Sequence, residues 1–253
     1  MMPSRRAAER LPHTRLMSRP ASQPETVPTD TGEMPAYLWL PESGRGPGLL
    51  LLQEIFGVSR YIQQRGSDLA RAGYVVLAPE LYWRLDAGPL DESDPGVIQE
   101  AMGRAQQLDW PTTVQDAVAA LETLRERDDV SGGFGVIGFC FGGGLGFNVA
   151  AVEEPDVLVS YYGSSIPGLL DLAPKVTAPS LHHFGTADDY IDQATVERIR
   201  EAVTAGRQTV EFETYEGANH AFDNPDFMLH HPEASVLAWQ RTMAFLAREL
   251  PVG

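Results

Sequence analysis

The chain alternates short apolar runs with longer amphipathic stretches, and this alternation predicts how its elements are arranged. Continuous apolar runs at 48–53 and 74–79 are typical of strands that are buried on both faces of a parallel sheet. A stretch with helical periodicity, 61–72, lies between them and ends at Gly73. Strands that alternate with helices in this way indicate an α/β fold with a doubly wound, mostly parallel sheet flanked by helices.

The same patterns predict the remaining elements and the boundaries of the domain. Strands are expected at 36–41, 134–138, 157–162, 180–184 and 210–215, and helices at 97–107, 111–127, 145–152, 193–205 and 232–250. Residues 1–28 are rich in Arg, Ser, Pro and Thr and lack periodicity, which predicts a disordered N-terminal tail. Residues 29–253 contain no repeat and no linker, so we expect one domain there, without a separate cap domain.

Composition narrows the classes of function. A hydrophobic fraction of 43% is ample for a large core. The net charge of −16 argues against nucleic acid as a partner, because phosphate contacts need basic patches. No stretch approaches the roughly 18 apolar residues that a membrane span needs. The single Cys excludes an internal disulfide and any metal site built from several cysteines, and it indicates a reducing, cytoplasmic setting.

A reactive side chain follows the apolar run 134–138 in a glycine-rich setting. The segment 138–142 reads Gly-Phe-Cys-Phe-Gly, so Cys140 has a glycine two residues away on either side. This is the strand–turn–helix pattern of a nucleophile elbow, with Cys in place of Ser. The glycines permit unusual backbone angles and let strand and helix approach closely. The positive end of the following helix favours a thiolate, and the Phe141 N–H can point at a developing oxyanion.

A thiol nucleophile needs a base and a third group that orients the base. Asp188 and His220 fit these roles, because each follows a strand of the predicted sheet, where ligands bind in open α/β folds. The order Cys, Asp, His along the chain is that of the α/β-hydrolase triad.

Other acids and histidines are weighed against these two. Asp189, next to Asp188, could take its role instead. His182 and His183 lie inside the apolar strand 180–184 and are interpreted as structural residues. Nothing in the sequence has zinc-ligand spacing, so these residues do not predict a metal site.

Glu54 and Arg84 stand out because Glu54 directly follows one buried strand and Arg84 lies in the segment after the next one. A carboxylate after the run 48–53 is costly to bury unless it has a partner. Both residues should lie at the carboxyl edge of the sheet, near Cys140. In one interpretation they form a salt bridge that stabilises the loops. In the other, Arg84 binds a substrate anion and frees Glu54 to influence the thiol.

These residues resemble those of the dienelactone hydrolase family, which has the α/β-hydrolase fold. The matching stretches are 53–57, 78–84, 138–143, 161–163, 185–188 and 220–222, in the family's order and with similar spacings. Together they extend over roughly residues 30–250.

The resemblance implies a hydrolase that opens an enol-lactone through an acyl-enzyme, without a metal or an organic cofactor. It implies Cys140 as nucleophile, His220 as acid and base, and Asp188 as the residue that orients His220. It also implies that Glu54 contacts the resting thiol and takes its proton when a substrate carboxylate meets Arg84. The implied oxyanion hole consists of the N–H groups of Ile55 and Phe141, and the implied substrate contacts are Arg84, Phe56 and Tyr82. The expected partner is a small anionic molecule, and the expected assembly is a monomer or a small homo-oligomer.

The chain departs from the family pattern just after the histidine. Well-studied members have a hydroxyl residue and a second arginine at the positions of Ala221 and Asn224. Losing one charged contact to a carboxylate removes about 1.5–3 kcal/mol of binding. A general lactone or ester hydrolase is therefore an open alternative to a dienelactone-type enzyme.

Two other functions remain open. Class I glutamine amidotransferases also have a Gly-x-Cys-x-Gly elbow, and their histidine lies in a His-Pro-Glu motif, which this chain has at 231–233. Here the motif is expected to open the last helix, with Pro in its first turn. The third possibility is a non-catalytic binding or redox-sensing protein on a hydrolase fold.

Overall fold

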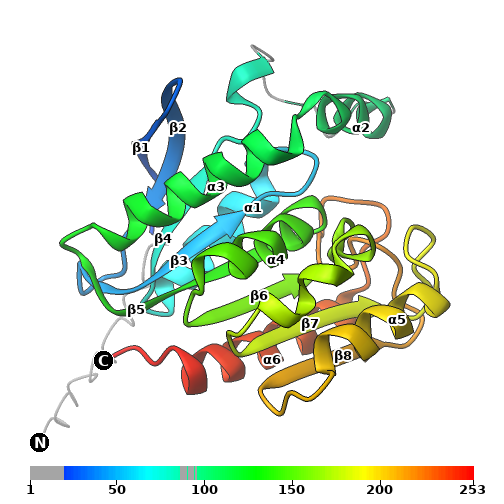
Figure 1. Cartoon of the computed structure of the whole chain (residues 1–253). Helices are drawn as coiled ribbons and strands as arrows, with labels where there is room; N and C mark the ends of the chain where they lie inside the picture. The colour runs from blue at the N-terminus through cyan, green and yellow to red at the C-terminus, as the bar shows by residue number, and fades with distance from the viewer. Residues whose placement is uncertain (1–19, 86–89, 91–93, 95) are drawn as a thin grey trace, which may run out of the picture.

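One twisted sheet forms the centre of the computed structural model, which describes residues 20–85, 90, 94 and 96–253 (Figure 1). Within these residues the sheet has eight strands in the order β1-β2-β4-β3-β5-β6-β7-β8. The strands are β1 Gln23–Thr29, β2 Gly32–Trp39, β3 Gly46–Leu52, β4 Val75–Pro79, β5 Val130–Phe139, β6 Val157–Tyr161, β7 Ser180–Gly185 and β8 Val210–Tyr215. Strands β3 to β8 run parallel, whereas β2 pairs antiparallel with both β4 and β1.

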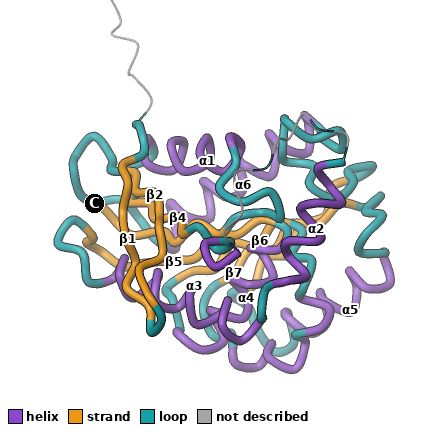
Figure 2. The backbone as a smooth tube through the Cα atoms, turned by 90° about the horizontal axis from the view of Figure 1, so that it is seen from above, coloured by secondary structure: helices purple, strands orange, loops and turns teal. Residues whose placement is uncertain are grey.

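Helices cover both faces of this sheet. They are α1 Arg60–Arg71, α2 Val97–Gln107, α3 Trp110–Arg125, α4 Phe141–Glu153, α5 Gln193–Thr204 and α6 Pro232–Glu249, with short 3₁₀ turns at Trp83–Leu85, Ile166–Gly168 and Leu170–Lys175. Seen from above, α1 and α6 lie on one side of the strands and α3, α4 and α5 on the other (Figure 2). None of the helices in the described part of the chain is long and apolar enough to cross a membrane.

The continuous apolar run of β3 has a direct structural cause. Leu49 and Leu51 pack in the core beneath α1 and α6, whereas Leu50 and Leu52 pack in the core beneath α3 and α4. All four side chains are fully buried. Both faces of the strand therefore need apolar residues, which explains why period-two alternation is absent. The predicted doubly wound α/β fold is confirmed.

The N-terminal boundary of the domain was predicted wrongly. Residues 23–28, assigned to a disordered tail, belong to the edge strand β1, which pairs with β2 along its whole length. Pro24 and Pro28 obscured the pattern, but an edge strand tolerates proline because half of its N–H groups need no partner within the sheet. Val27 is fully buried against the core. The rest of the predicted tail, residues 1–19, lies outside the described residues.

The elbow between β5 and α4 depends on a very close approach of backbones. A Cβ atom on Gly138 would lie 2.0 Å from the carbonyl oxygen of Gly142, and one on Gly142 would lie 2.3 Å from that of Leu52. Backbone atoms cannot move aside as a flexible side chain can. Any side chain at these two positions would therefore push α4 away from the sheet.

Replacing Gly142 should be costly for this reason. We expect Gly142→Ala to lower the free energy of unfolding by at least about 2 kcal/mol, because the added methyl group overlaps main-chain carbonyls. Gly168→Ala is the matched control, since a Cβ there meets nothing within 4 Å, and it should change stability by less than about 1 kcal/mol. Urea unfolding curves of both variants test this, and equal effects would contradict it.

Candidate active site

Cys140 lies on the turn between β5 and α4 with strained backbone angles. Its φ of 52° and ψ of −110° place a non-glycine residue outside the common regions, at a cost of about 1–3 kcal/mol. Hydrogen bonds hold this conformation: the Cys140 N–H donates to the Tyr161 carbonyl at 2.9 Å, and its own carbonyl accepts from the Gly143 N–H at 3.0 Å. The sulfur thus lies at the N-terminal end of α4, where partial positive charge favours a negative group.

His220 and Asp188 meet at this sulfur. The Nε2 atom of His220 lies 3.0 Å from Cys140 Sγ, and its Nδ1 atom lies 2.9 Å from Asp188 Oδ2. The second oxygen of Asp188 accepts from the N–H groups of Tyr190 at 2.8 Å and Ile191 at 2.9 Å. The loops after β7 and β8 therefore bring together the three side chains that the sequence singled out. Asp189 does not join them.

Asp189 has a different partner. Its Oδ2 accepts from the side-chain amide of Asn219 at 2.6 Å, on the exposed side of the loop. The histidine of the His-Pro-Glu motif is also elsewhere, because His231 is the N-cap of α6 and its Nδ1 accepts from the Ala234 N–H at 3.3 Å. His182 and His183 are fully buried within β7. No group of three or more potential metal ligands occurs among the residues that the structure describes.

The electrostatic coupling between Cys140 and His220 is strong because both are nearly buried. Burial alone lowers the pKa of His220, but the negative charge of Cys140 and the hydrogen bonds with Asp188 and Cys140 raise it to about 10. The protonated form of the His220 ring is therefore favoured at neutral pH, so that its Nε2 can donate a hydrogen bond to the sulfur.

Two backbone N–H groups at the cavity are without protein acceptors. Ile55 and Phe141 both line the cavity next to Cys140, and within the described residues neither N–H donates to a protein group. The Tyr82 hydroxyl donates to the Ile55 carbonyl at 2.8 Å and so fixes the loop that carries Ile55. These two N–H groups can donate hydrogen bonds to the oxyanion that forms from a substrate carbonyl.

Glu54 is buried at the same cavity as Cys140, but within the described residues it makes no hydrogen bond with the sulfur. Its carboxylate accepts from the Tyr162 hydroxyl at 3.1 Å and from the Asn224 side-chain amide at 2.8 Å. Among the described residues, the hydrogen-bonding partners of Cys140 Sγ are His220 and, at 3.8 Å, the Ser164 hydroxyl. The expected contact between Glu54 and the resting thiol is therefore absent. Burial raises the pKa of Glu54 to about 7, although the hydrogen bonds from Asn224 and Tyr162 oppose this rise.

Arg84 does not reach the site, which corrects both interpretations of this residue. Its guanidinium pairs with Asp116 on α3, at 2.6 Å from Nη2 to Oδ1, and it also donates to Thr31 in the turn between β1 and β2. The guanidinium carbon lies 4.1 Å from the Trp83 ring centroid. Arg84 thus ties the turn between β1 and β2 to α3, and it forms neither a salt bridge with Glu54 nor part of the cavity wall.

The cavity beside Cys140 has a volume of about 350 Å³ and mostly apolar walls. Phe56 lines it as expected. Tyr82 instead lines a separate cavity of about 930 Å³, between the β1–β2 hairpin and the loop after β4, and Phe56 borders both. Tyr82 is thus not part of the wall beside Cys140, but it supports the site through its hydrogen bond with Ile55.

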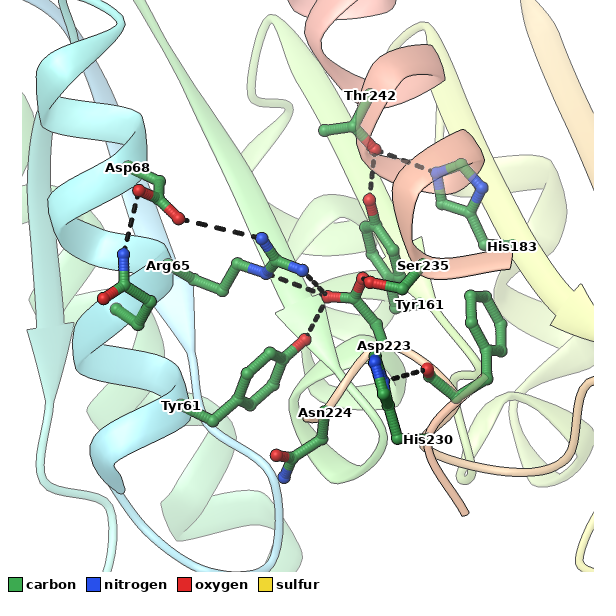
Figure 3. A network of polar contacts seen from close by, with 12 residues as sticks. Tyr61, Arg65, Asp68, Tyr161, His183, Asp223, Asn224, His230, Ser235 and Thr242 are labelled. Atoms are coloured by element: carbon green, nitrogen blue, oxygen red, sulfur yellow. Dashed lines mark hydrogen bonds and ion pairs between the residues drawn. The ribbon is translucent and has the colours of Figure 1, made fainter. Parts of the chain in front are cut away.

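A buried network that the sequence analysis did not predict supports the loop that carries His220. Arg65 on α1 donates to the Asp223 carboxylate at 2.6 Å, and the Ser235 hydroxyl on α6 donates to it at 2.8 Å (Figure 3). The Tyr61 hydroxyl donates to the same carboxylate. Asp223 is fully buried three residues after His220, so these bonds anchor the loop to α1 and α6.

Comparisons with known proteins identify the family of this chain. The sequence model of the Dienelactone hydrolase family matches residues 34–250. Carboxymethylenebutenolidase from Pseudomonas sp. (strain P51) is 34% identical over 223 residues, which cover 88% of this chain and 93% of the relative. The enzyme of the same name from Pseudomonas putida is 32% identical over 213 residues, 84% of this chain and 90% of its own. The crystal structure of a putative dienelactone hydrolase from Klebsiella pneumoniae subsp. pneumoniae MGH 78578 matches with a TM-score of 0.77 and 28% identity, covering 90% of this chain and 98% of that one.

The raised pKa of Glu54 predicts a pH-dependent cost to stability. The folded protein holds this proton more tightly than the unfolded chain, so stability should fall as the pH rises from about 4.5 to about 7 and then level off. Glu54→Gln removes the ionisation while its amide can still bond with Asn224 and Tyr162. We expect the variant to be more stable than the parent at pH 8, by on the order of 1–3 kcal/mol, and this gain to shrink at pH 5.

Urea unfolding at the two pH values measures the effect. The exposed Glu42→Gln is the matched control and should show no such difference between pH 5 and pH 8. A Glu54→Gln variant less stable than the parent at pH 8 would show that the buried carboxylate is favourable there.

Proposed function

Because the chain belongs to the dienelactone hydrolase family, we propose that it hydrolyses a carboxylic ester or lactone with Cys140 as the nucleophile. The observation that carries this proposal is the continuous line of contacts from Cys140 Sγ through the His220 ring to Asp188. A sulfur next to an imidazole, which a carboxylate orients in turn, is the arrangement that acyl transfer requires.

In the proposed reaction, His220 holds the thiol proton and Cys140 Sγ attacks the carbonyl carbon of the substrate. The carbonyl oxygen becomes an oxyanion that the N–H groups of Ile55 and Phe141 stabilise. When the intermediate collapses, the carbon–oxygen bond of the ester breaks and His220 gives its proton to the leaving alkoxide. A thioester on Cys140 remains. Water then attacks this thioester with His220 as the base, which releases the acid and restores the thiol.

Glu54 fits an indirect role in this scheme. Its carboxyl group lies next to the reacting atoms and bonds with Tyr162, whose ring centroid lies 5.2 Å from that of His220. We infer that Glu54 positions Tyr162 and tunes the charge around His220 without touching the sulfur. The thiol, the imidazole and the backbone N–H groups suffice for the chemistry, so the proposal needs neither a metal nor an organic cofactor.

The amidotransferase alternative has little support from the geometry. It would need the histidine of the His-Pro-Glu motif at the sulfur, whereas His231 caps α6 and His220 occupies that place. The redox-sensing alternative shares the paired sulfur and imidazole but predicts no turnover of esters. An assay of ester hydrolysis therefore separates the two remaining functions.

Removal of the base should abolish most of the activity. We expect His220→Ala to lower kcat on p-nitrophenyl acetate by about 10²–10⁴-fold, because general-base catalysis typically contributes that much. His231→Ala is the matched control: it loses a helix cap worth about 1 kcal/mol of stability but should keep activity within a few-fold of the parent. The reverse pattern would favour the amidotransferase-like site. Circular dichroism checks that both variants fold.

The acyl-enzyme should be directly visible. With p-nitrophenyl acetate, we expect a burst of p-nitrophenol up to one equivalent per chain and an acetyl group on Cys140 in quenched samples, measured by mass spectrometry. Cys140→Ala should show neither signal, and iodoacetamide should remove both from the parent. Steady turnover by the Cys140→Ala variant would mean that another group is the nucleophile.

A further inference from the structure

We propose that the cavity beside Cys140 takes a neutral ester or lactone with an apolar body rather than a substrate that carries a carboxylate. The inference rests on the proposed function and narrows it to one class of substrate. It reverses the expectation of an anionic substrate, which depended on Arg84 at the site.

The walls of the cavity are built to contact hydrocarbon. Helix α2 presents Ile98, Met102 and Ala105, which are spaced so that they share one face of the helix. Aromatic rings form much of the remaining wall, contributed by Phe56, Trp110, Phe141 and Phe227. Such a surface gains free energy by removing apolar groups of a ligand from water.

None of the arginines near this region lines the cavity. Arg84 is held by Asp116 on the far side of the loop after β4. Arg104, on α2, pairs with Glu100 at 2.6 Å and borders the separate cavity next to Trp83.

Besides the neutral side chains of Gln106, Ser164, Ser165 and Tyr190, the wall carries one acid, and the nearby amide of Asn224 is not part of it. Glu54 is itself an acid and is nearly fully buried. The side-chain amide of Asn224 donates to Glu54, so this donor is already engaged. Ala221 contributes only a methyl group. The one cation that lines the cavity among the described residues, His220, is already paired with Asp188 and Cys140. A substrate carboxylate would therefore lose its water of hydration without gaining an arginine or lysine partner among these residues, which is strongly unfavourable.

A matched pair of substrates tests the inference. p-Nitrophenyl pentanoate and mono-p-nitrophenyl glutarate share the same chain, except that the glutarate ends in a carboxylate where the pentanoate ends in a methyl group. After correction for uncatalysed hydrolysis, we expect kcat/KM for the pentanoate to exceed that for the glutarate by about 100-fold or more. The burst of acyl-enzyme on Cys140 is recorded for both substrates.

A cation placed on the cavity wall should change this ratio. Met102 is 40% exposed at the cavity, so an arginine there can point inward without being buried. We expect Met102→Arg to raise the glutarate-to-pentanoate ratio of kcat/KM by at least about tenfold. Val152→Arg adds the same charge at an exposed position on α4 outside the cavity and should leave the ratio unchanged. Thermal unfolding checks that both variants fold.

The outcomes separate the two proposals. If the parent hydrolyses the glutarate as well as or better than the pentanoate through Cys140, the substrate class is wrong and the cysteine hydrolase remains. A similar change of ratio in both arginine variants would also overturn the inference, since it would reflect net charge alone. If neither ester acylates Cys140, the proposed function fails and the inference fails with it.

Discussion

The strained turn at Cys140 is the constraint on which the rest of the site depends. A residue with a φ of 52° can persist there only because neighbouring elements hold its backbone on both sides. The Tyr161 carbonyl of β6 and the first turn of α4 supply these bonds, and Gly138 and Gly142 allow the strands and the helix to come close enough to make them. The direction of the sulfur is therefore set by main-chain contacts in the centre of the sheet.

The histidine is held in a different way, from outside the sheet. Its loop is anchored by Asp223, whose buried carboxylate joins α1 through Arg65 to α6 through Ser235 (Figure 3). A buried carboxylate with three donors is well satisfied, and such networks fix one conformation where apolar contacts alone would allow several. The cysteine and the histidine thus approach each other from two independently fixed parts of the molecule.

Features that depend on neighbouring residues could be predicted from the sequence, whereas contacts between residues far apart in the chain could not. The buried strands were recognisable because neighbouring residues such as Leu49 and Leu50 face opposite sides of the sheet and both sides are apolar. Asp188 and His220 could be located because each follows a strand of this sheet. The role of Arg84 could not be predicted, since its partner Asp116 lies on α3, thirty-two residues away in sequence, and only the packing of α3 against the β1–β2 hairpin brings them together. The role of Asn224 could not be predicted either. In the sequence it stands where well-studied members of the family have an arginine, and in the structure its side-chain amide donates to Glu54.

The position of α2 separates two tasks within one protein. The helix supplies one wall of the cavity but none of the contacts that hold Cys140, His220 or Asp188. Substitutions in α2, or a displacement of this helix, can therefore change which molecules enter the cavity without moving Cys140, His220 or Asp188. During evolution, substrate specificity can therefore change through substitutions in a peripheral helix. The catalytic residues and the sheet that holds them can stay the same.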